Sequence, residues 1–130
     1  MKNPKDTPIY KDDVLDALAT EPLSFGFWVN DSGCSACAVG ATIRNKVDKN
    51  LSDYTIGSYM SPECATRLHN ELFSKNPTWL ELLSMLWESL YMYSVEEARW
   101  VAYEWVEENF PEDVDYWKKA DPNLLEKLNV

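Results

Sequence analysis

A chain of 130 residues is long enough to bury the hydrophobic core of one domain, and 45% hydrophobic residues with six Trp exclude a disordered polypeptide. No apolar run approaches the roughly 18 residues of a transmembrane helix, and the first ten residues lack the apolar stretch of a secretory signal. A formal net charge of −10 argues against direct binding to nucleic acid or to an anionic membrane, and it favours a basic protein partner.

The sequence predicts a mainly α-helical, single compact domain of five to seven helices over residues 11–130, preceded by a flexible arm over 1–10. Capping residues, prolines and the spacing of apolar side chains mark the helices. In chain order, we expect five of them over 11–20, 34–47, 62–75, 79–93 and 95–110. Two shorter helices are expected over 113–119 and 121–128. The aromatic segment 23–29 is expected to form a short β element or an extended entry segment. Residues 48–60 are expected to form a loop, with one helical turn or a short strand as the alternatives.

Two capping boxes open the two central helices of the second half. Thr78 with Glu81, and Ser94 with Glu97, each place a hydroxyl and a carboxylate three residues apart at a helix start. In the first of these helices, over 79–93, apolar side chains cover all but a narrow polar strip. That helix is therefore predicted to be the buried centre of the fold.

The helix over 95–110 has two different faces when its side chains are placed at about 100° per residue. A core stripe is formed by Ala98, Val101, Ala102, Trp105 and Val106. Glutamates fall on the opposite side, at Glu96, Glu97, Glu104, Glu107 and Glu108. Trp100 lies in the middle of these glutamates, with Tyr103 and Phe110 at the edge.

The acidic residues of this region have almost no cations to balance them. Between Asn76 and Trp117 the sequence has ten acidic residues and one basic residue, Arg99. An exposed helix face usually carries Lys or Arg one turn from its carboxylates, which relieves like-charge repulsion. Since that relief is nearly missing, we infer that the acidic face binds a partner. Carboxylates around an aromatic anchor suit the basic surface of a nucleic-acid-binding protein, such as a nuclease.

The predicted function is that of a small acidic inhibitor, of the anti-defence or immunity type, which imitates nucleic acid on a basic protein. The candidate partner-binding residues are Glu96, Glu97, Trp100, Glu104, Glu107, Glu108, Glu112, Asp113 and Asp115. The alternative for Trp100 is burial under the C-terminal helices, with glutamates that only keep the protein soluble. A further alternative is a homodimer that covers Tyr59, Tyr91 and Tyr93.

The cysteines allow three interpretations. We favour packing, in which Cys34, Cys37 and Ala41 line one face of the helix over 34–47 as small apolar residues. The first alternative is a zinc-stabilised interaction domain with C-x₂-C and C-x₄-H spacing. Its ligands would be Cys34, Cys37, Cys64 and His69. The second alternative is a Cys34-dependent enzyme, with the thiol at a helix start and His69 as the base.

Other catalytic and cofactor motifs are missing from the sequence. It has no Gly-rich phosphate loop, no G-x-S-x-G motif and no Glu-x-x-His of a di-metal bundle. We therefore expect a protein that is not an enzyme and uses no cofactor. Three cysteines leave one unpaired in any disulfide scheme, so without a signal sequence a cytoplasmic location is expected.

Trp28, Cys34, Cys37 and Gly40 lie in the stretch FGFWVNDSGCSACAVGATI. It has an aromatic-x-Trp segment, then C-x-x-C, a glycine and a small-residue helix. In these features the chain resembles a type of small uncharacterised phage and bacterial protein. The resemblance implies a bacterial or mobile-element origin and brings no function with it.

Overall fold

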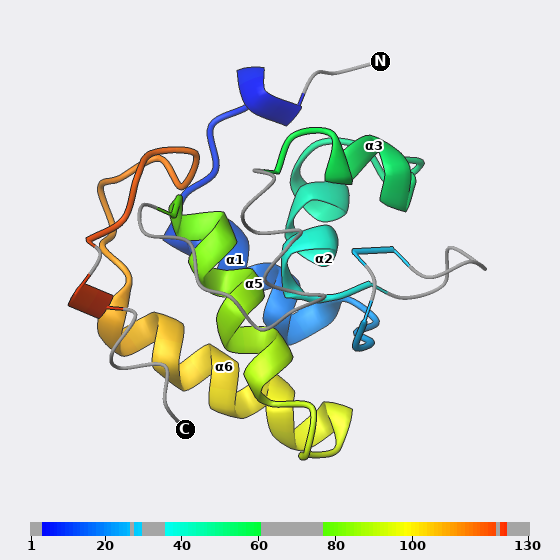
Figure 1. Cartoon of the computed structure of the whole chain (residues 1–130), viewed down its shortest axis with the longest axis vertical. Coiled ribbons are helices and arrows are strands. Elements are labelled where there is room, and N and C mark those ends of the chain that lie inside the picture. Colours follow the sequence, from blue (N-terminus) through cyan, green and yellow to red (C-terminus); the bar gives the residue numbers. More distant parts are fainter. Residues whose placement is uncertain (1–3, 27, 30–35, 61–76, 122, 125–130) are drawn as a thin grey trace.

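Five α-helices and one short 3-10 helix make up most of the part of the chain that the computed structural model describes, residues 4–26, 28–29, 36–60, 77–121 and 123–124 (Figure 1). They are η1 (Pro4–Asp6), α1 (Lys11–Thr20), α2 (Ala38–Lys46), α3 (Asp53–Gly57), α5 (Trp79–Ser89) and α6 (Val95–Asn109). The mainly α-helical class is thereby confirmed. Within these residues, β pairing is limited to two isolated bridges, Leu23 with Ala36 and Thr78 with Lys119. The β element expected over 23–29 is thus reduced to one bridge.

Three further expectations concern single helices. Helix α3 supplies the helical turn that was an alternative for residues 48–60. The helix expected over 62–75 lies outside the described residues, and so does most of the one expected over 121–128.

Among the helices that the structure describes, none has the length and apolar character needed to cross a bilayer.

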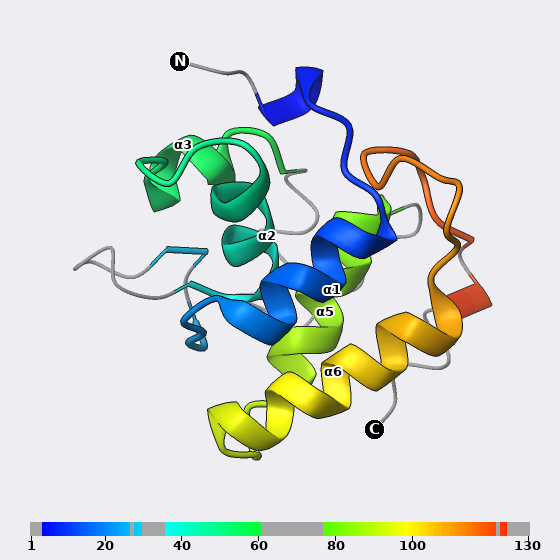
Figure 2. The same ribbon diagram turned by 180° about the vertical axis from the view of Figure 1, so that it is seen from behind.

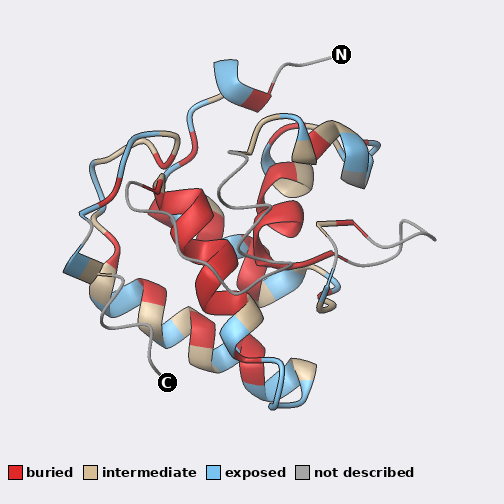
Figure 3. Cartoon of the chain, viewed as in Figure 1, coloured by how far each residue is buried: buried red, intermediate tan, exposed pale blue. Residues whose placement is uncertain are grey.

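Helix α5 forms the centre of the fold, as its sequence predicts. All residues from 79 to 87 are buried, and α2 and α6 pack against the helix (Figure 3). Both hydrogen bonds of the capping box are present. The backbone N–H of Glu81 donates to Oγ1 of Thr78 over 3.1 Å, and the backbone N–H of Thr78 donates to Oε1 of Glu81 over 3.0 Å. The first residue of the polar strip, Glu81, therefore stabilises the start of the helix.

A tight turn between α5 and α6 replaces the last turn expected for α5. The helix ends at Ser89 rather than at Tyr93. The side chains from 91 to 93 are exposed. Because these side chains make no contact with the core, nothing stabilises a further turn of α5. Ser94 is the N-cap of the next helix, α6.

Helices α1 and α6 lie side by side and antiparallel (Figure 2). Each sends a cation to the C-terminal carbonyl groups of the other. The ammonium group of Lys11, at the start of α1, donates to the carbonyl O of Glu107 over 2.6 Å. The guanidinium group of Arg99 in α6 donates to the carbonyl O of Leu18 over 2.5 Å and of Glu21 over 3.0 Å. These cations stabilise both helix ends, because free carbonyls and the negative end of the dipole meet there.

Helix α2 begins later than the helix expected over 34–47. Its first residue is Ala38, and Cys37 is its N-cap with an extended backbone. Ahead of it, the N–H and the carbonyl of Ala36 bond to backbone groups on either side of Leu23, over 3.2 and 2.8 Å. A helix that began at Cys34 would need the carbonyl of Ala36 to accept from the N–H of Gly40. The expected helix start near Cys34 is therefore wrong.

The backbone at Trp28 crosses α2 at Gly40. A Cβ atom at Gly40 would lie 1.6 Å from the carbonyl O of Trp28, so glycine is required there. The ring of Trp28 reaches α3, where a Cβ atom at Gly57 would lie 2.7 Å from the ring atom Cζ3. Trp28 therefore joins α2 to α3 through the space that two glycines provide.

The segment after α6 forms an irregular strap, residues 111–120, and the helix expected over 113–119 is wrong. Backbone groups of the strap bond to distant parts of the chain. The N–H of Tyr116 donates to the carbonyl O of Ile9 over 2.7 Å, and the carbonyl O of Tyr116 accepts from the N–H of Leu80 over 3.3 Å. A helix would use these groups within itself, so long-range pairing has displaced helical pairing.

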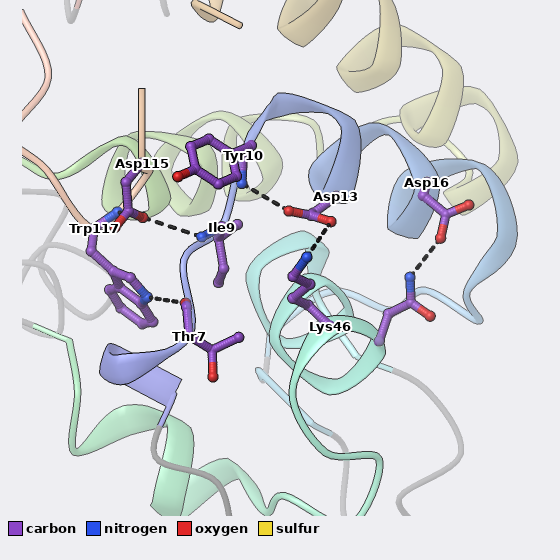
Figure 4. Close-up of polar contacts among 9 residues, drawn as sticks. Thr7, Ile9, Tyr10, Asp13, Asp16, Lys46, Asp115 and Trp117 are labelled. Carbon is purple, nitrogen blue, oxygen red and sulfur yellow. Dashed lines mark hydrogen bonds and ion pairs between the residues drawn. The ribbon is translucent and has the colours of Figure 1, made fainter. Parts of the chain in front are cut away.

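Residues 4–10, expected to belong to a flexible arm, are held against the strap (Figure 4). The backbone N–H of Ile9 donates to Oδ1 of Asp115 over 3.2 Å. The indole N–H of Trp117 donates to the carbonyl O of Thr7 over 3.2 Å. Because Ile9 is also fully buried, this segment is part of the folded domain.

Tyr116 anchors the strap in the core. Its ring is buried edge-on against Phe110, and its hydroxyl donates to the carbonyl O of Pro111 over 3.1 Å. Burial, and to a smaller extent the negative charges of Asp12 and Glu112, raise the pKa of this phenol well above its ordinary value. The fold therefore holds Tyr116 in its neutral form.

We expect the protein to lose stability at high pH because of Tyr116. In the unfolded chain a tyrosine ionises near pH ~10, whereas the folded-state pKa is higher. The contribution of the neutral phenol is complete below about pH 10 and is lost as the pH rises from there through the folded-state pKa. Thermal unfolding followed by circular dichroism should show a Tm that falls steeply above that pH. Tyr116→Phe should have a lower Tm at neutral pH but a shallower fall, and parallel curves would contradict this account.

Candidate protein-binding surface

The solvent side of α6 carries the acidic face that the sequence predicts (Figure 3). On the other side of the helix, Ala98, Ala102 and Val106 are buried. We name the solvent side the acidic surface, and it consists of Glu96, Glu97, Trp100, Tyr103, Glu104, Glu107 and Glu108. All of these residues are exposed except Tyr103, which is half-buried.

Ser94 fixes the start of this helix as its N-cap. Its Oγ accepts a hydrogen bond from the backbone N–H of Glu97 over 3.2 Å and donates to Oε1 of Glu97 over 2.9 Å. In a complete capping box the carboxylate of Glu97 would accept from the backbone N–H of Ser94. Here it accepts from the hydroxyl of Ser94 instead. The carboxylate of Glu97 is thereby held in the first turn, where the helix dipole favours a negative charge.

Trp100 is a surface residue at the middle of the acidic surface. Its side chain is 52% exposed. Its ring lies 5.6 Å from the ring of Tyr103, centroid to centroid, at an interplanar angle of 59°. The alternative that Trp100 is buried in the core is therefore wrong. The two rings together form an apolar centre among the glutamates.

Arg99, the single cation of α6, is turned away from most of these carboxylates. It is 8% exposed, and its guanidinium group bonds to α1 and, over 3.2 Å, to Oε1 of Glu96. Within the described residues, no ion pair includes Glu104, Glu107 or Glu108. The solvent side of α6 therefore keeps nearly its full negative charge.

The three acidic residues after α6 divide into two groups. Glu112 and Asp113 are exposed and extend the negative charge of α6 into the strap. Asp115 is half-buried, and its Oδ1 accepts from the backbone N–H groups of Ile9 and Trp117, each over 3.2 Å. Asp115 therefore holds the strap in place, and we leave it out of the binding surface.

The structure adds one feature that the sequence had not singled out as a binding element. Tyr91, Met92 and Tyr93, which we name the aromatic turn, are exposed in the turn that leads into α6. From the sequence, Tyr91 and Tyr93 were predicted only as residues that a homodimer would cover, together with Tyr59. Phe110, expected at the edge of the acidic face, is instead buried in the core.

The cysteine hypotheses depend largely on residues outside the described ranges. Cys34, Cys64 and His69 all lie there. Cys37 is 3% exposed and belongs to the hydrophobic core, which agrees with the packing interpretation for that residue. Across the ranges that the structure does describe, no cluster of three or more potential metal ligands occurs.

Comparisons with known proteins assign no residue to the surface. No protein-family model, curated protein or solved structure matches this chain. The residues of the acidic surface are therefore assigned from their exposure, charge and contacts.

Proposed function

We propose that this protein is a small acidic inhibitor, which binds a basic, nucleic-acid-binding protein through its acidic surface. One observation carries the proposal. Trp100 is exposed at the centre of a helix face on which, among the described residues, Glu96 alone has an ion pair, and its partner Arg99 is buried against α1. A partner that brings cations to this face would relieve the repulsion and bury the indole. A bacterial or mobile-element origin and a cytoplasmic location complete the proposal.

The spacing of the carboxylates supports the imitation of nucleic acid. Five glutamates lie between positions 96 and 108, a stretch that an α-helix covers in about 18 Å. The average is one negative charge per about 4 Å, close to the one phosphate per about 3.4 Å along a DNA strand, in two groups that lie about 10 Å apart. A protein surface built to bind phosphates would therefore meet a similar mean density of charge on α6.

Charge and apolar contact would play different parts in such a complex. The negative field would speed the encounter with a basic surface, and that effect weakens as salt screens it. The indole of Trp100 would slow dissociation, since a Trp desolvated at the centre of an interface commonly contributes about 2 kcal/mol or more. The acidic surface does not suit a homodimer, because two copies would repel each other there.

We expect Trp100→Ala to abolish capture of the partner and to leave the fold intact. The wild-type protein, immobilised at low salt, should retain a basic protein from a bacterial lysate and release it at high salt. Trp100→Ala should retain none, with a Tm within about two degrees of wild type, because truncation of an exposed side chain changes stability little. The matched control is Tyr54→Ala, which truncates an aromatic residue that is 88% exposed on α3 and should bind like wild type.

The retained protein must then show the inhibition that we propose. Added to the purified partner, wild type should displace bound DNA or RNA in proportion to its concentration, and Trp100→Ala should not. Retention that is equal for wild type and Trp100→Ala, or a retained protein that binds no nucleic acid, would contradict the proposal. An unfolded Trp100→Ala would contradict the placement of this side chain on the surface.

A further inference from the structure

Two side chains of the aromatic turn are exposed to a larger fraction than Trp100, the apolar centre of the acidic surface. Met92 is 79% exposed and Tyr91 is 66% exposed, against 52% for Trp100. We propose that the aromatic turn is a second contact for the same partner. The turn would dock on an apolar patch at the border of the partner's basic surface. The inference rests on the proposed function and adds to it the chemistry of the partner, a basic surface with an apolar neighbour.

Hydrogen bonds fix the backbone of the aromatic turn. The backbone N–H of Leu90 donates to the carbonyl O of Trp87 over 3.0 Å, and that of Tyr93 donates to the carbonyl O of Leu90 over 2.9 Å. The side chain of Leu90 is fully buried beneath the turn. The backbone of the turn therefore has little freedom left for a partner to remove, so the ordering cost of binding falls mainly on the side chains.

The turn continues directly into the acidic surface. It leads into Ser94, the N-cap of α6, and Trp100 lies about 9 Å further along the helix axis. A standard interface covers about 800 Å² on each partner, which is more than one face of a four-turn helix offers. We infer that a partner seated on Trp100 extends past the start of α6 onto the turn, the exposed apolar segment that precedes the N-cap.

The charge distribution argues for the basic partner over a second copy of this chain. No charged residue occurs between positions 89 and 95, whereas the helix that follows has five glutamates. Two copies that met turn to turn would bring their acidic surfaces close together, and each chain has a net charge of −10. A basic partner would instead attract the glutamates while its apolar border covers the turn.

The test uses two synthetic probes in place of the natural partner. One is a helical peptide rich in Lys and Arg, and the other is the same peptide extended by a short apolar end of Leu and Trp. Wild type should bind the extended peptide about tenfold more tightly than the plain one, because the apolar end covers the turn. Tyr91→Ser combined with Met92→Ser should remove that difference and leave the affinity and the salt dependence for the plain peptide unchanged.

Three variants separate this inference from the proposed function. Trp100→Ala and Glu104→Lys should weaken the binding of both peptides, and Tyr54→Ser should weaken neither. If the plain peptide binds equally to wild type and Glu104→Lys, the proposed function fails. If the plain peptide binds as expected but the apolar end adds no affinity, the inference about the turn fails. It also fails if the apolar end adds the same affinity for the variant with Tyr91→Ser and Met92→Ser. A dimer of wild type in sedimentation equilibrium that this variant dissolves would also overturn it.

Discussion

Replacing Gly40 with alanine is expected to destabilise the protein by about 3 kcal/mol or more, which lowers the Tm by about 10 °C. The new methyl group would lie 1.6 Å from the carbonyl O of Trp28. That atom belongs to the backbone, so no side-chain rotation can remove the overlap, and α2 must separate from the segment around Trp28. Thermal unfolding or urea titration of the purified variant measures the loss directly.

The prediction for Gly40→Ala opposes the usual effect of this substitution in a helix. By helix propensity alone, alanine in place of a helical glycine stabilises by about 1 kcal/mol. Gly57→Ala is the matched control, because its Cβ would meet the ring of Trp28 rather than its backbone. A ring can shift, so we expect a smaller loss there. A Gly40→Ala protein as stable as wild type would show that Trp28 does not cross α2 as described.

Replacing Arg99 with methionine is expected to destabilise the protein by about 2 to 4 kcal/mol. Methionine keeps much of the apolar stem, but the carbonyl groups of Leu18 and Glu21 lose their donor. Each unsatisfied buried acceptor costs about 1 to 3 kcal/mol, and the α1 C-terminus also loses the cation that complements its dipole. Urea titration of wild type and variant gives the difference in unfolding free energy.

Arg99→Lys is the control for charge, and Glu96→Gln is the control for the ion pair. Lysine keeps the positive charge but cannot span both carbonyl groups, so about half of the loss should remain. Glu96→Gln should change stability by less than about 1 kcal/mol, because the carboxylate is 74% exposed. If Glu96→Gln were as harmful as Arg99→Met, Arg99 would act through the ion pair rather than through α1.

Local signals in the sequence predicted α1 and the starts of α5 and α6 correctly. The helix over 11–20 has the predicted bounds, and Thr78 and Ser94 are N-caps at the predicted positions. The strap after α6 could not be predicted in this way. Its conformation depends on hydrogen bonds from Tyr116 to Ile9 and from Leu80 to Tyr116, and residues so far apart leave no periodic pattern in the sequence.

The candidate surface was predictable in part for the same reason. Helical spacing alone placed Trp100 among the glutamates on one face of α6. It could not decide whether that face is covered, nor that Arg99 turns toward α1, because both depend on how α1 packs. Nothing in the sequence distinguishes Asp115 from the other acidic residues of the region, because its hydrogen-bond partner, the backbone N–H of Ile9, is 106 positions away.

The pairing of residues 7–9 with the strap determines when the chain can complete its fold. Thr7 and Ile9 bond to Trp117 and Asp115, partners that lie 110 and 106 positions away along the chain. A ribosome adds about 5 to 20 residues per second, so Thr7 and Ile9 would wait about 5 to 20 seconds for the strap. Helix α2, which also packs against α1, is made much sooner. Until α6 follows, the side of α1 that packs against α6 and the C-terminal carbonyl groups of α1 stay uncovered. This domain therefore completes its core only when synthesis has passed the strap, and chains that stop earlier become substrates for chaperones and proteases.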